Sequence, residues 1–159
     1  MSLTVPNRDD WFQNADTFPR PDWRAIEGWM RAFATDDVTT DAWQQFTRHW
    51  LERLRARLDG DYTVAESENF HFLSEVVPNM ATNTLSFLET ARRQIYKVLG
   101  EVAPRETYGK HVVLRFTETD DNYLYISHFH RAGEYARSGG MFLDDGYMHI
   151  AYPKSWSET

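Results

Sequence analysis

Residues 111–116 read His-Val-Val-Leu-Arg-Phe, with an uninterrupted apolar centre. Such a run predicts a short strand in the interior of a sheet, because both of its faces must be covered. Further along the chain, the strand-like runs 141–143 and 147–152 flank Asp144-Asp145-Gly146. Asp-Gly between two such runs is a strong hairpin signal. We therefore expect a sheet built around residues 111–116 and including a C-terminal hairpin.

Working outward, residues 62–64 and 69–73 also have strand composition, with Glu66 to Glu68 as a polar interruption. Pro78-Asn79 opens a predicted helix that Gly100 closes. Its expected buried stripe is Leu85, Leu88, Ala91, Ile95 and Leu99. A short helix is expected after residue 116, with N-capping groups from Thr117 to Asp121, and it should end near Phe129. Strands that alternate with helices predict a partly parallel sheet covered by helices.

The N-terminal part predicts a helical hairpin. Asp22 is a candidate cap for a helix whose apolar stripe is Ile26, Met30 and Phe33. Thr39 or Thr40 is expected to cap a second helix, and Gly60 is expected at its C′ position. The stripe of this second helix is Trp43, Phe46, Trp50, Leu54 and Leu58, with Leu51 alongside. Residues 1–20 are predicted to form an irregular arm pinned by Trp11, Phe12 and Phe18.

These elements predict an α+β fold with α/β-like features, organised as one globular unit. Its expected parts are the arm 1–20, the helical hairpin 21–60 and a small mixed sheet packed on helices over 61–159.

The composition excludes several classes of protein. The chain has 159 residues, 42% of them hydrophobic, which argues against disorder. Its formal net charge of −7 argues against nucleic-acid binding. It has no cysteine, so any metal would need histidine and carboxylate ligands. Neither a signal peptide nor a run approaching the ~20 apolar residues of a membrane span is visible, so we expect a soluble cytoplasmic protein without a membrane partner.

The last residues predict the start of another helix. Ser155-Trp156-Ser157-Glu158 fits a capping box, in which a serine and a glutamate three residues later satisfy each other's helix-end donors. The sequence ends at Thr159. We therefore expect a truncated domain, although the same four residues also arise by chance.

The order of several segments is similar to one known family. The run 68–72, the helix 85–99 with Leu88-Glu89-Thr90-Ala91-Arg92-Arg93, the strand 111–116, and Gly139-Gly140-Met141-Phe142 before residues 147–152 occur in that order. Together they resemble the N-terminal half of a peptidase-MA-like, gluzincin-type metallopeptidase domain over residues 62–159. The resemblance implies a twisted mixed sheet over helices, whose last strands form the upper wall of a substrate cleft. Met141, Phe142, Leu143, Tyr147 and His149 are the cleft residues that it implies.

Family members follow those strands with a helix carrying His-Glu-x-x-His, which binds zinc and activates a water molecule. This chain contains no such motif. We therefore expect no complete catalytic site and no cofactor in this chain, and zinc only in an intact family member. On this interpretation the chain is a non-catalytic fragment or remnant, acting as scaffold and cleft wall for a peptide or protein partner.

Two alternatives remain open. An exposed aromatic and apolar sheet face would make the chain a protein-interaction module, or would pair two copies of it. His128 and His130, with Glu134 nearby, are the weak candidates for a metal site in a small metal-dependent hydrolase. His71 and His149 are expected to be half-buried strand residues. Ser138-Gly139-Gly140 lacks the strand-to-helix elbow of a hydrolase serine.

Overall fold

A computed structural model describes residues 3–13, 18–35, 38–102, 108–130 and 139–154. The chain divides into two compact units, residues 1–59 and residues 60–159, and each is described by itself. Within the described ranges, no helix combines the length and the apolarity that crossing a membrane requires.

The first unit is a pair of helices with a short ladder before them. Its elements are η1 (Asp9–Trp11), β1 (Phe12–Gln13), β2 (Arg20–Pro21), α1 (Trp23–Phe33) and α2 (Thr39–Arg55). β1 and β2 pair antiparallel, so the predicted irregular arm contains regular structure. Trp11, Phe12 and Phe18 are buried, as predicted for the residues that pin this arm.

Phe46 lies at the centre of the aromatic core of this unit. Its ring lies 5.8 Å from that of Trp23 and 6.1 Å from that of Trp43. The whole predicted stripe of α2 is buried, including Leu58 beyond its end. Trp and Phe bury large apolar areas, so this stripe supplies much of the stability of the unit.

Helix ends were predicted less well. Asp22 caps α1 as expected, because its carboxylate accepts the N–H of Ala25 at 3.0 Å. Phe33 was expected in the buried stripe but is 61% exposed at the last position of α1. Thr39 and Thr40 are the first two helical residues of α2, so neither is its cap. The Thr39 hydroxyl donates to the carbonyl of Thr35.

Gly60 is not the C′ residue of α2, which ends five residues earlier at Arg55. Its φ of +115° explains why glycine is favoured there, because other residues rarely adopt this conformation. A Cβ at this position would lie 2.5 Å from Oε1 of Glu75, the same atom that accepts the N–H of Asp61. Gly60 therefore shapes the entry to the second unit.

The second unit is a five-stranded mixed sheet with helices. Its elements are β3 (Thr63–Glu66), β4 (Phe70–Ser74), α3 (Pro78–Leu99), η2 (Gly100–Val102), β5 (His111–Phe116), α4 (Thr119–Ser127), β6 (Met141–Leu143) and β7 (His149–Pro153). The strand order is β3-β4-β5-β7-β6. β5 is parallel to both of its neighbours, whereas the two outer pairs are antiparallel. The fold is α+β, and the predicted interior position of residues 111–116 is confirmed.

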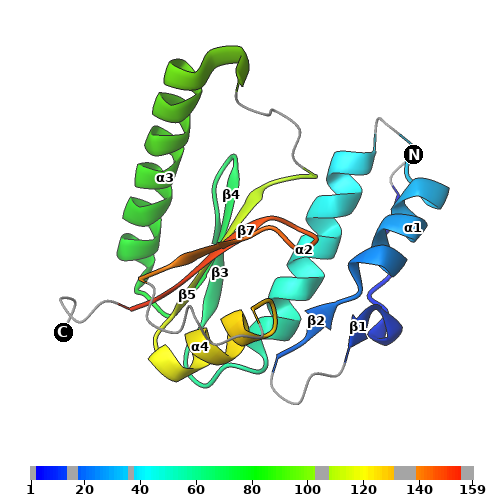
Figure 1. The fold of residues 1–159 in the computed structure, drawn as a ribbon, viewed down its shortest axis with the longest axis horizontal. Coiled ribbons are helices and arrows are strands. Elements are labelled where there is room, and N and C mark those ends of the chain that lie inside the picture. Colours follow the sequence, from blue (N-terminus) through cyan, green and yellow to red (C-terminus); the bar gives the residue numbers. More distant parts are fainter. Residues whose placement is uncertain (1–2, 14–17, 36–37, 103–107, 131–138, 155–159) are drawn as a thin grey trace. The chain divides into compact units, whose positions relative to one another are not determined.

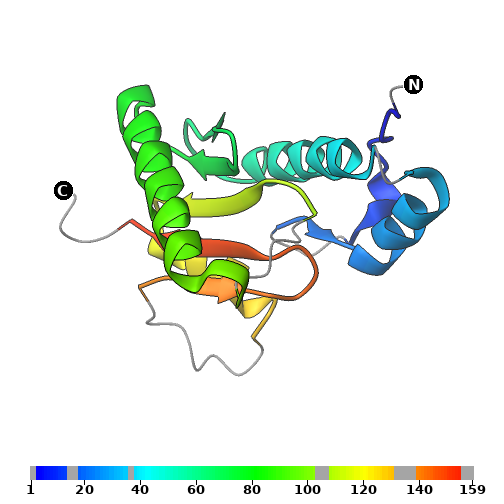
Figure 2. The same cartoon turned by 90° about the horizontal axis from the view of Figure 1, so that it is seen from above.

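Two helices pack on opposite faces of this sheet (Figure 1). α3 packs on β4, where Ala81 and Leu85 join Phe70 and Phe72 in one core cluster. α4 packs on β5 and β7, where the ring of Tyr125 lies 5.3 Å from that of Phe116. Figure 2 shows α3 crossing in front of β5 and β7.

The hairpin of β6 and β7 forms as predicted, with Gly146 at a φ of +77°. β7 begins at His149, two residues later than expected, so Tyr147 lies in the turn. Pro153 is the last residue of β7. No side chain caps α4. The predicted capping box at residues 155–158 lies outside the described residues.

Candidate binding groove

One row of side chains crosses four strands of the sheet on the α3 face. The register pairs Phe72 with Val113, Val113 with Ile150, and Ile150 with Phe142. Residues paired directly across strands point to the same face. Their exposed fractions rise along the row from 0% for Phe72 and 2% for Val113 to 40% for Ile150 and 59% for Phe142. This face is therefore covered over β4 and β5 and open over β7 and β6.

The C-terminal half of α3 forms the opposite wall of a groove over this open part. Leu88, Ala91, Ile95 and Leu99 line it at helical spacing, and its volume is about 370 Å³. Ile95 and Leu99 were predicted to be buried, but they are 54% and 47% exposed. The first half of α3 packs on β4, whereas Ile95 and Leu99 in its second half are left uncovered by the described residues of this unit.

Two polar side chains interrupt the apolar lining of the groove. The guanidinium of Arg92 lies over the ring of Tyr96, 4.7 Å from its centroid. The Nε atom of Arg92 is buried and has no hydrogen-bond partner among the described residues. Beside it, the ring of His111 lies 5.2 Å from that of Phe70.

His111 is the second polar group of the groove, and its pKa is lowered. Burial is the main cause, and the positive charge of Arg92 adds to it, while Glu89 acts in the opposite direction. A lowered pKa leaves the imidazole neutral near pH 7. Arg92 is therefore the cation of the groove.

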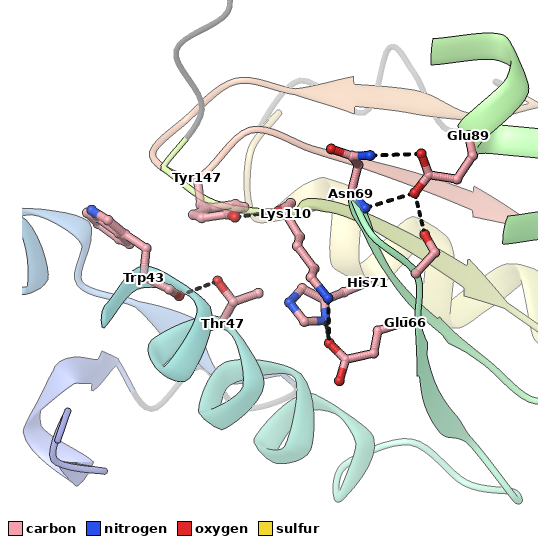
Figure 3. Close-up of polar contacts among 9 residues, drawn as sticks. Trp43, Thr47, Glu66, Asn69, His71, Glu89, Lys110 and Tyr147 are labelled. Atoms are coloured by element: carbon pink, nitrogen blue, oxygen red, sulfur yellow. Dashed lines mark hydrogen bonds and ion pairs between the residues drawn. The ribbon is translucent and has the colours of Figure 1, made fainter. Parts of the chain in front are cut away.

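Glu89 holds the middle of α3 against the turn between β3 and β4 (Figure 3). Its carboxylate accepts hydrogen bonds from the Ser67 hydroxyl at 2.7 Å, from the Asn69 backbone N–H at 2.8 Å and from the Asn69 side-chain amide at 2.9 Å. Burial acts to raise the pKa of Glu89, but these hydrogen bonds and the charge of Arg92 outweigh it and lower the pKa. The wall of the groove is thus fixed to the sheet by a charged anchor.

The predicted cleft residues separate onto two faces. Phe142 and His149 border the groove, whereas Met141, Leu143 and Tyr147 do not. Leu143 and Tyr147 are buried, and the Tyr147 hydroxyl donates to the carbonyl of Lys110. The structure therefore does not gather the five residues into one cleft.

His149 borders the groove through its position in β7, but its imidazole is directed to the α4 face. Its Nδ1 lies 2.7 Å from the carbonyl oxygen of Tyr147, and its Nε2 lies 2.8 Å from the hydroxyl of Tyr125. A carbonyl can only accept, so Nδ1 carries the proton and Nε2 accepts from Tyr125. Burial lowers the pKa of His149 to about 4. The prediction of a half-buried residue is wrong, since 2% of His149 is exposed.

The weak metal candidates lie at the end of α4. His128 is the C-cap residue, and the backbone N–H of His130 donates to the carbonyl of Ile126. Glu134 lies outside the described residues. Among the residues that the structure describes, no three His, Cys, Asp or Glu side chains are arranged to hold a metal ion.

A third polar cluster links β3, β4 and the residue before β5. The Lys110 Nζ atom lies 3.0 Å from Glu66 Oε2, and Nδ1 of the fully buried His71 lies 3.5 Å from the same oxygen (Figure 3). His71 was predicted to be half-buried, so this prediction is also wrong. The Lys110–Glu66 pair connects strands and supports the sheet; Glu66 is 41% exposed, so screening by solvent keeps its contribution small.

Comparison with protein-family models, curated proteins and solved structures finds no match to this chain.

Sequence reasoning missed Arg92, His111 and Ile150 as groove residues. Alternation in β7 was the signal that could have found Ile150, because it points opposite to His149. No local pattern distinguishes Ile95 and Leu99 from the buried Leu85 on the same helix.

Proposed function

We propose that this chain is a protein-interaction module, whose groove between α3 and the sheet binds an apolar segment of a partner protein. The observation that carries the proposal is the exposure gradient along the row from Phe72 to Phe142. Large apolar side chains gathered in a concave, solvent-open surface are typical of binding sites. Ile95 and Leu99 extend the same surface onto the helix.

The proposal is tested by selecting peptides that bind the purified protein from a random display library and measuring their affinity for variants of the groove. Replacement of groove side chains in Ile95→Ser and Phe142→Ser should weaken the selected peptides about tenfold each, a loss of about 1.4 kcal/mol. Phe87→Ser is the matched control, because Phe87 is 70% exposed on the same helix but does not line the groove. Peptides that bind all three variants equally would place the binding surface elsewhere and overturn the proposal.

The edge position of β6 favours a second candidate, the scaffold and cleft-wall role implied by the metallopeptidase resemblance. β6 pairs only with β7 in the described part of the sheet, so its outer backbone groups can receive an extended peptide. In this candidate the zinc ligands come from residues that the sequence does not contain. Genomic DNA encoding an in-frame His-Glu-x-x-His after codon 159 would support it, and a stop codon there would contradict it.

The response to Ile95→Ser separates the two candidates, because backbone methylation would weaken a helical peptide as well as an extended one. An extended peptide on β6 depends on its N–H groups, so methylation at alternate residues abolishes its binding. Such a peptide should also tolerate Ile95→Ser, because Ile95 lies on the helix wall.

A further inference from the structure

We propose that the occupant of this groove is an acidic amphipathic helix of a partner protein, with a carboxylate paired to Arg92. This inference rests on the proposed function and specifies the partner. Three features of the groove support it: the lack of free backbone groups in its floor, its length along α3, and the charge of its helical wall.

The floor of the groove favours a helix over an extended segment. β4, β5 and β7 each pair with a strand on both sides, so their backbone groups are already hydrogen-bonded. The lining that remains is mainly apolar side chains. An extended segment buried there would leave its own N–H and C=O groups unpaired, at a cost of about 1–3 kcal/mol each. A helix satisfies its backbone internally and needs only side-chain contacts.

The length of the groove suits about three helical turns. Leu88 and Leu99 are eleven residues apart on α3, which corresponds to roughly 16 Å at 1.5 Å per residue. A partner helix with apolar residues at i, i+4, i+7 and i+11 spans the same length. Its apolar stripe would cover Ile95 and Leu99 on one side and Ile150 and Phe142 on the other.

The charge of the helical wall favours an acidic partner. Between residues 88 and 99 the cations are Arg92, Arg93 and Lys97, and the single anion is Glu89, although the whole chain has a net charge of −7. The Glu89 carboxylate is already engaged by Ser67 and Asn69. The local excess of positive charge therefore attracts carboxylates and repels α3 of a second copy.

Arg92 is the residue expected to set where a carboxylate of the partner binds. Stacking over Tyr96 orients its guanidinium, and its buried Nε atom lacks a partner among the described residues. A planar guanidinium can bind a carboxylate through two parallel hydrogen bonds. Once a bound partner covers the apolar groove and excludes water, such a pair is stronger and less screened by salt than one on the surface.

Three matched sets of helical peptides test the inference by fluorescence anisotropy on the full chain. Within each set, the apolar residues at the four groove-facing positions vary, and the same combinations are used in all three sets. The sets differ only at the flanking positions, which carry Glu, Gln or Lys. We expect the Glu set to bind about tenfold more tightly than the Gln set, and the Lys set to bind least. A proline at the centre of a Glu peptide should abolish binding, because it breaks the helix.

Substitutions of the two neighbouring arginines show which of them pairs with the carboxylate of the bound peptide. Arg92→Gln should reduce the affinity of the Glu set to that of the Gln set and leave the Gln set unchanged. Arg93→Gln is the control, because Arg93 is exposed and does not line the groove, and it should change the affinity for the Glu set much less. Circular dichroism verifies that both variants are folded.

The outcomes distinguish the inference from the proposed function. Equal binding of the Glu and Gln sets, or an equal effect of Arg92→Gln on both, overturns the acidic partner while Ile95→Ser can still weaken every set. Retained binding of the proline peptide overturns the helical occupant. Self-association of the chain that Ile95→Ser abolishes would identify a second copy as the occupant and overturn the inference. Failure of all three sets to bind counts against the proposed function itself.

Discussion

The two faces of the five-stranded sheet differ in how completely they are covered. On the α4 face, Phe116, Leu143 and His149 are all nearly inaccessible, and the polar atoms of His149 are paired with Tyr125 and with the backbone. On the α3 face, burial is complete at Phe72 on β4 and is lost at Phe142 on β6, three strands further along the same row. The difference separates a face that is sealed by its helix from a face that leaves large apolar side chains exposed.

The largest expected effect contrasts one phenylalanine from each face. Phe116→Ala should lower the free energy of unfolding by about 3–5 kcal/mol, because Phe116 is 1% exposed and its loss leaves a cavity. Phe142→Ala should change it by no more than about 0.5 kcal/mol. Urea denaturation followed by circular dichroism measures both. Similar losses would show that Phe142 is buried in solution and that the two faces are equally covered.

Acid should weaken the covered face through His149. The pKa of His149 is about 4 in the folded chain and near 6.5 when unfolded, so between these values only the unfolded state takes up the proton. Stability from the neutral imidazole is therefore complete above pH 6.5 and is lost as the pH falls towards 4, by up to roughly 3 kcal/mol. Denaturation midpoints at neutral and acidic pH should differ more for the wild type than for His149→Gln. Identical pH dependence would assign the acid effect to other groups.

On the open face, Glu89 should make a smaller contribution to the free energy of unfolding. Glu89→Gln removes the charge that holds Ser67 and Asn69 and should cost about 1–2 kcal/mol. Glu68→Gln is the control at an exposed neighbouring position, with an expected change within about 0.5 kcal/mol. Thermal unfolding compares the two. If Glu89→Gln is neutral, α3 does not depend on this anchor, and the groove wall is held by Ala81 and Leu85 alone.

The smallest expected effect concerns metal ions. We expect zinc to bind this chain no more tightly than it binds scattered surface histidines, because His149 is engaged on the covered face and the described residues hold no three-ligand group. Equilibrium dialysis measures this directly. Stoichiometric submicromolar binding, lost in His128→Ala or His130→Ala, would instead favour the metal-dependent alternative.

Local signals predicted the elements well where they were strong and self-contained. Each of these signals depends on only a few neighbouring residues. They are the apolar run 111–116, the Pro78 start and Gly100 end of α3, and the Gly146 turn. The α2 stripe was also correct, because every apolar residue of its period has a partner in the core. The caps predicted at Thr39 or Thr40 and at Gly60 were wrong, because several nearby residues could end a helix equally well.

The groove could not be predicted, because exposure depends on which element lies opposite. Leu85 and Ile95 occupy the same stripe of α3, yet one packs on Phe70 and Phe72 while the other faces an uncovered part of the sheet. His149 was identified as a site residue, but its direction depends on the strand register and on Tyr125, twenty-four residues away.

The amino-acid sequence determined the main helices and strands, their order and the α+β class, because period, turn residues and helix breakers act over a few neighbouring positions. The tertiary structure alone decided how far α3 covers the sheet, and therefore that Arg92 and Ile95 share a groove with Phe142 while His149 is sealed beneath α4. Burial and pKa depend on neighbours that are distant in the chain, and no short pattern of residues encodes them.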